Sequence, residues 1–167
     1  MTSFQDAHKV SNELAEVLVT TPPINLITRQ TDWVNPIGTY VALPSVAVSG
    51  RRYRVLEVGC TIQTAGTAAH SGVISVGIVG DTDAFIALNN ADLPATTVVG
   101  ETYSTSAGGA DAWSFAGAGT GNIDSDGVAF LGIGEQIIFT IGSNVANGPH
   151  AIFFAKLAPV LARDIFV

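Results

Sequence analysis

Residues 51–63, with the sequence RRYRVLEVGCTIQ, decide the fold of this chain. One face of the segment carries apolar side chains at every second position: Leu56, Val58, Cys60 and Ile62. The other face carries a mixed set: Tyr53, Val55, Glu57 and Thr61. A period of two is typical of a β-strand, because successive side chains in a strand point to opposite faces. We therefore expect one long β-strand here.

Similar segments extend in both directions from this strand, with Gly, Pro and Asn between them. Further strands are expected at 38–43, 46–48, 72–80, 85–88, 96–99, 113–115, 128–133, 136–141 and 151–157. The pair Asn147-Gly148 is a tight-turn signal and predicts a hairpin between the last two segments. About eight strands separated by turn signals predict an all-β, antiparallel β-sandwich of jelly-roll type.

The first 37 residues differ from this β pattern. Residues 1–20 predict an amphipathic helix, since apolar residues recur at helical spacing: Phe4, Val10, Leu14 and Leu18. Prolines make residues 20–37 an extended connector, and Trp33 within it is expected to anchor on the core or on a partner. The helix likewise packs either on its own domain or on a neighbouring subunit. The expected organisation is a helical and extended arm, 1–37, followed by a sandwich domain, 38–167.

The composition indicates assembly. Of the 167 residues, 47% are hydrophobic and only 13% are charged, against about 25% charged in an average soluble domain. This excludes a disordered chain or a coiled coil, both of which need many charges. A poorly charged, apolar surface is expected to be buried against partners. The apolar end of the chain belongs to the same expectation: Ile165, Phe166 and Val167.

The charge balance also limits the partners and the location. The net charge is −7, which disfavours nucleic acid because its binders neutralise phosphates with basic residues. No 18-residue apolar run predicts a membrane helix, and residues 1–10 lack a secretory signal pattern. The single cysteine, Cys60, cannot form an intrachain disulfide. We expect synthesis in a reducing cytoplasm.

One loop has the composition of a cation site. In the segment 122–127, NIDSDG, three oxygen-bearing side chains alternate before a glycine: Asn122, Asp124 and Asp126. Alternate oxygens in a tight loop can converge on calcium, although the acidic ligand expected further along is replaced by Ile133. The other interpretation is a solvated turn. The sequence offers no catalytic pattern, so we expect neither an enzyme nor a cofactor other than calcium.

The basic residues are concentrated at the start of the long strand. Arg51, Arg52 and Arg54 lie within four positions, although the whole chain has only seven Lys and Arg residues. The cluster is either a solvated strand entrance or a docking point for an acidic patch on a partner or a sister subunit. Arginine suits such docking because its planar guanidinium binds carboxylates through two hydrogen bonds.

As a whole, the chain resembles a small structural protein of a tailed phage or similar virus, and most of all a capsid decoration, or cement, protein. The resemblance lies in the arm, the Gly/Ala/Thr-rich sandwich, the low lysine content and the apolar end. It implies a sandwich or jelly-roll subunit, often a homotrimer, that binds the major capsid protein and sister subunits on the outer capsid. A net charge of −7 favours the outer surface, away from packaged genome.

Two other functions stay open at this point. A small jelly-roll coat subunit, or a tail or fibre component, would share the same composition. A carbohydrate- or calcium-binding sandwich module would instead present a groove lined by aromatic residues, with Tyr103 and Trp113 as candidates.

Overall fold

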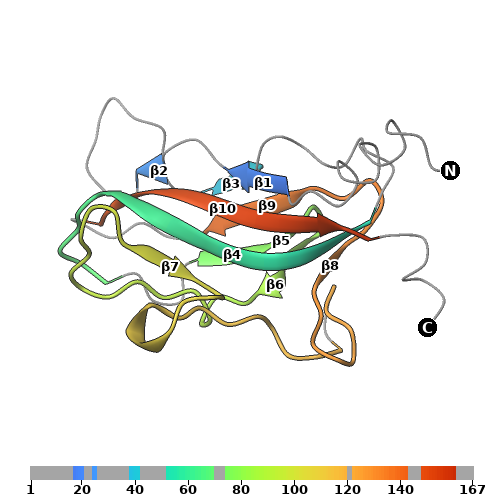
Figure 1. Cartoon of the computed structure of the whole chain (residues 1–167). Helices are drawn as coiled ribbons and strands as arrows, with labels where there is room; N and C mark the ends of the chain where they lie inside the picture. Colours follow the sequence, from blue (N-terminus) through green and yellow to red (C-terminus); the bar gives the residue numbers. More distant parts are fainter. Residues whose placement is uncertain are drawn as a thin grey trace, which may run out of the picture.

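The protein is an antiparallel β-sandwich of two sheets (Figure 1). The computed structural model describes residues 17–20, 24–25, 38–41, 52–69, 74–119, 122–142 and 148–160. The six-stranded sheet contains β1 (Val17–Thr20), β2 (Ile24–Asn25), β10 (His150–Pro159), β4 (Tyr53–Thr64), β7 (Thr102–Ser104) and β8 (Phe130–Leu131). The four-stranded sheet contains β3 (Gly38–Val41), β9 (Ile137–Ile141), β5 (Ile74–Ile78) and β6 (Asp81–Ile86).

The strand order confirms the predicted fold class. Strands early and late in the chain alternate across each sheet, in the orders β1-β10-β4-β7 and β3-β9-β5-β6. Strand β2 continues the edge formed by β1, and β8 lies beside β4 along the same edge as β7. Two sheets whose neighbours are joined by such crossovers form the double Greek key of a jelly roll. A single short 3₁₀ turn, η2 (Gly109–Asp111), is the one helical element in the described ranges, where no helix could span a membrane.

A β-bulge in β4 corrects the predicted faces of the long strand. Glu57 pairs with Lys156, whereas Val55 pairs with Leu157, so Leu56 is an extra residue without a cross-strand partner. The extra residue reverses the alternation. Tyr53 and Val55 therefore share the buried face with Val58, Cys60 and Ile62, and Glu57 points to the other side.

The core lies between the two sheets. Its largest side chains come from both of them, and Phe153 on β10 lies at its centre, with ring-centroid distances of 5.3 Å to Phe139 and 6.3 Å to Trp113. Trp113 comes from the long connection after β7, and its indole N–H donates to the Asp92 carbonyl at 3.0 Å. The Ala- and Gly-rich stretch between β6 and β8 thus supplies core residues although it forms few strands.

Three predictions of local structure are wrong. Val17–Thr20 is a strand paired with β10 instead of the last turn of a helix, and Ile24–Asn25 is a second paired strand. The expected hairpin across Asn147-Gly148 does not form, because β9 and β10 belong to different sheets. Of the segments 96–99 and 113–115, neither is a strand. Pairing with strands distant in sequence overrides these local signals.

Two adjacent phenylalanines on β10 point to opposite sides of the six-stranded sheet, so their substitution compares the stability that each side contributes. Phe153 is fully buried, whereas Phe154 points to the outer side and is half-buried. We expect Phe153→Ala to lower the free energy of unfolding by about 3–5 kcal/mol, and Phe154→Ala to cost about half of that or less. Urea unfolding of both variants measures the difference. Equal losses would contradict the assignment of Phe154 to an open face.

Candidate functional site

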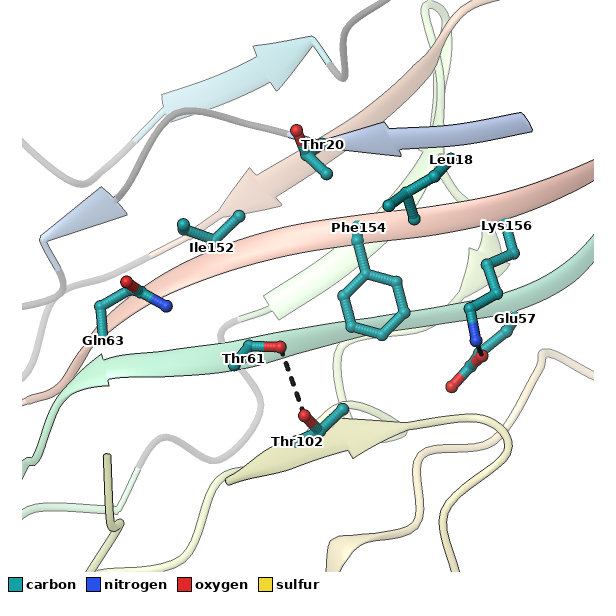
Figure 2. Close-up of a pocket in the computed structure, with 9 residues that line it drawn as sticks. All are labelled: Leu18, Thr20, Glu57, Thr61, Gln63, Thr102, Ile152, Phe154 and Lys156. Atoms are coloured by element: carbon teal, nitrogen blue, oxygen red, sulfur yellow. Dashed lines mark hydrogen bonds and ion pairs between the residues drawn. The ribbon is translucent and has the colours of Figure 1, made fainter. Parts of the chain in front are cut away.

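The outer side of the six-stranded sheet carries a depression of about 460 Å³, called here the open groove (Figure 2). Four strands contribute to it, and its lining residues are Leu18, Thr20, Glu57, Thr61, Gln63, Thr102, Ile152, Phe154 and Lys156. Because these side chains come from segments more than a hundred residues apart, only the sheet pairing brings them together.

The middle of the open groove is apolar. Phe154 and Ile152 project from β10, and Leu18 on β1 stands beside them with 54% of its surface exposed (Figure 2). Side chains of this size are stabilised by burial. Apolar side chains gathered on the outside of a sheet are typical of a docking surface.

A glycine gives the groove its shape. Phe154 pairs across the sheet with Gly59 on β4. A Cβ atom at Gly59 would collide with the Tyr103 carbonyl oxygen and the Ser104 side chain on β7. Glycine therefore allows β7 to approach β4, and it leaves space on the outer side next to the Phe154 ring.

An ion pair between a half-exposed lysine and a buried glutamate closes one end of the open groove. The Glu57 carboxylate lies 2.5 Å from Lys156 Nζ, and Ser104 Oγ donates to Glu57 Oε1 at 2.6 Å. Burial alone would raise the pKa of the Glu57 carboxyl, but the hydrogen bonds from Lys156 and Ser104 and the charge of Lys156 hold this pKa below its ordinary value. The carboxylate is thus ionised and already satisfied within the chain.

The hydroxyl groups beside the aromatic ring are also paired. Thr61 Oγ1 and Thr102 Oγ1 share a hydrogen bond of 3.3 Å across β4 and β7 (Figure 2). With the pairs Glu57–Lys156 and Thr61–Thr102 each engaged internally, the groove offers a partner mainly apolar area and shape. Such a surface is suited to docking another protein.

The two sheets differ in how their outer sides are covered. On the outer side of the four-stranded sheet, Ser75 and Ile138 are each 2% exposed. Strand β9 thus has buried residues on both of its sides. On the six-stranded sheet, by contrast, Leu18 remains half exposed. The open groove is the side of the sandwich that lacks an equivalent cover in the described structure.

The predicted arginine cluster lies at the end of the same sheet. Arg52 and Arg54 are exposed where β4 begins, and the Arg52 guanidinium carbon lies 5.1 Å from the centroid of the Phe130 ring on β8. The backbone N–H of Val160, just after β10, donates to the Arg52 carbonyl at 2.9 Å. A second depression, of about 330 Å³, lies here beside Arg52, Asn122 and Glu135.

The loop 122–127 uses its polar groups within the chain. Asp124 Oδ1 accepts the backbone N–H groups of Asp126 and Val128 at 3.0 and 2.8 Å. Asn122 turns its amide nitrogen to Glu135 Oε2, at 2.7 Å. No group of three or more His, Cys, Asp or Glu residues in the described part of the chain could hold a metal ion. The geometry fits the solvated-turn interpretation of this loop.

The other predicted residues divide into two groups. Leu18 lines the open groove. The rest of the predicted interface lies outside the described residues: Phe4, Val10, Leu14, Trp33, Arg51, Ile165, Phe166 and Val167. Sequence reasoning missed Ile152 and Phe154 as surface residues. Their positions next to the inward-pointing Phe153 were the available signal.

The aromatic residues proposed for a sugar-binding groove belong to the core. Tyr103 and Trp113 are 1% and 3% exposed, respectively. The Tyr103 hydroxyl donates to Glu101 Oε2 at 2.8 Å. Burial and this neighbouring carboxylate raise the pKa of Tyr103. Neither ring is available for stacking on a ligand.

Comparison with protein-family models, curated proteins and solved structures finds no match to this chain.

The loop 122–127 allows a matched test of the calcium interpretation. Asp124→Ala removes an acceptor of two backbone hydrogen bonds, and we expect it to lower the free energy of unfolding by about 1–2 kcal/mol. Asp126→Ala, at an exposed position, should cost much less. Calcium should leave the melting temperature of the wild type unchanged. A calcium-dependent rise that both substitutions abolish would instead establish a cation site.

The Glu57–Lys156 pair predicts a pH dependence. Because the Glu57 pKa is lower in the folded protein than its ordinary 4.5, ionised Glu57 stabilises the fold above that value. This contribution is lost as the pH falls through the lower folded pKa. Urea unfolding at about pH 7 and about pH 3 should show a smaller loss for Glu57→Gln than for the wild type. The matched change Asp111→Asn, at an exposed carboxyl, should show the same loss of unfolding free energy between the two pH values as the wild type.

Proposed function

We propose that this chain is a structural protein of a virion, and specifically a capsid decoration protein that binds the outer capsid surface and stabilises the shell. The observation that carries the proposal is the open groove, an apolar depression on the outer side of a jelly-roll sheet. A surface of this kind is stabilised when a second protein covers it.

The fold and the composition support the same assignment. Jelly rolls are a recurrent architecture of viral capsid proteins, and they are found in lectins and cupins as well. Only 13% of this chain is charged, which is low for a protein that remains a free monomer. In a decoration protein, contacts with the shell and with sister subunits would cover the apolar area.

The proposed partners are the major capsid protein and other copies of this chain, assembled as a homotrimer or another homo-oligomer. The proposed location is the outer surface of the virion, after synthesis in the host cytoplasm. A net charge of −7 supports the outer surface, because packaged genome repels a negatively charged protein.

A coat subunit, or a tail or fibre component, is the second candidate. The open groove favours it as well, since these proteins also bury sheet faces against neighbours. The carbohydrate-binding alternative is not supported, because Tyr103 and Trp113, its candidate aromatic residues, are buried in the core.

Immunogold electron microscopy tests the proposal. An antibody raised against the purified chain is applied to particles released from cells that produce it. Label over intact capsids, displaced by an excess of free chain, is the expected result. Label confined to tails or fibres would support the second candidate, and particles without label would overturn a virion role. Preimmune serum provides the control.

A further inference from the structure

The end of the sandwich where β4 begins combines opposite charges with exposed apolar turns. This surface, called here the arginine end, consists of Arg52 and Arg54 together with the turns 78–81 and 132–135. Ile78 pairs with Ile137, so both turns lie beyond the same position of the four-stranded sheet. Pairing of β8 with Tyr53 and Arg54 brings the second turn close to the start of β4.

Apolar side chains occupy the tips of both turns. Val79 is 73% exposed and Ile133 is 66% exposed, the two highest values among the large apolar residues of the described ranges. Each precedes a glycine with positive φ, Gly80 at 97° and Gly134 at 82°. The turn geometry requires these glycines, but it does not require an apolar residue before them, where most residue types are accepted.

The arginines lack an acidic partner within the described structure. Of the three basic residues there, Lys156 is paired with Glu57 in the open groove. Arg52 and Arg54 form no ion pair with another described residue. Two exposed guanidinium groups thus remain at one end of a protein that has few positive charges, and arginine is the basic residue enriched at protein interfaces.

The same end carries an acidic counterpart. Asp81 and Asp83 lie on β6, directly after the turn with Val79 and two positions apart on the strand. Burial and the neighbouring Asp83 carboxyl raise the pKa of Asp81. Two carboxyls this close would be stabilised by a nearby cation, and no described Lys or Arg provides one within the chain.

We propose that Arg52 and Arg54 of one copy bind Asp81 and Asp83 of the next copy, with Val79 and Ile133 buried in the contact. The charges lie on different sheets: Arg54 is on β4 with Arg52 just before it, and the aspartates are on β6, an edge strand. Opposite charges at separate positions on one subunit are what a contact between identical copies needs. The inference deepens the proposed function, since it identifies the surface through which sister subunits assemble.

Other acidic groups fit this role less well. Glu57, Glu101, Asp124 and Glu135 accept hydrogen bonds inside the chain. Asp111 is exposed on η2 after β7, away from the arginine end. The pair on β6 directly follows the exposed apolar turn at Val79.

Charge reversal with light scattering tests the contact. The wild-type chain should have a molar mass that is a multiple of 17.2 kDa. The variants Arg52→Glu/Arg54→Glu and Asp81→Arg/Asp83→Arg should each raise the dissociation constant by about 100-fold or more and give the monomer mass. Combining all four changes should restore the assembly. High salt, about 0.5 M, should weaken the wild-type assembly as well.

Controls separate the possible outcomes. Asp111→Arg makes the same acidic-to-basic change as Asp81→Arg, but at another exposed site, and it should leave the molar mass unaffected. Circular dichroism checks that every variant is folded. A wild-type monomer at all concentrations, or an assembly that survives both reversals, would overturn the inference. So would failure of the four-fold variant to reassemble while folded. Immunogold label on capsids with a monomeric chain would leave the proposed function intact, whereas an assembling chain absent from particles would reject that function alone.

Discussion

The pairing of β4 with β10 is the contact on which the rest of the structure depends. Ten residues of β10, from His150 to Pro159, pair with β4 at the centre of the six-stranded sheet. β1 and β2 join the sheet only through β10, and β7 and β8 only through β4. The sheet therefore cannot be completed until the last strand of the chain is in place. Such long-range pairing makes chain closure costly and folding slow compared with a protein of local contacts.

The bulge at Leu56 determines which side chains of β4 lie on the outer side of the sheet. With strict alternation, Glu57 would point into the core with Tyr53 and Val55. The extra residue puts Glu57 on the outer side, where it pairs with Lys156, while Arg52 and Arg54 also stay outside. A single inserted residue thus keeps a carboxylate out of the core, while the arginines stay exposed.

Period-two alternation predicted the strands with strong apolar faces, including the long strand at 51–63 and those at 136–141 and 151–157, and with them the fold class. It failed where local signals compete with distant pairing. Val17–Thr20 continued a helical pattern, and the short polar strand Thr102–Ser104 had no alternation to detect. The arginine cluster was visible as a run in the sequence. The open groove was not, because Leu18, Thr102 and Phe154 become neighbours only after β1, β7 and β10 have paired in one sheet.

The structure shows where the many apolar residues of this poorly charged chain lie. Apolar residues fill the space between the sheets and continue onto the outer side of the four-stranded sheet, the open groove and the turn tips at Val79 and Ile133. Most charged side chains of the described residues interact with groups of the same chain, as in the Glu57–Lys156 pair. On a surface with so few free charges, each remaining one acts with little competition from neighbours. Opposite charges at defined positions can then determine which surfaces meet, while the apolar area supplies the stabilisation.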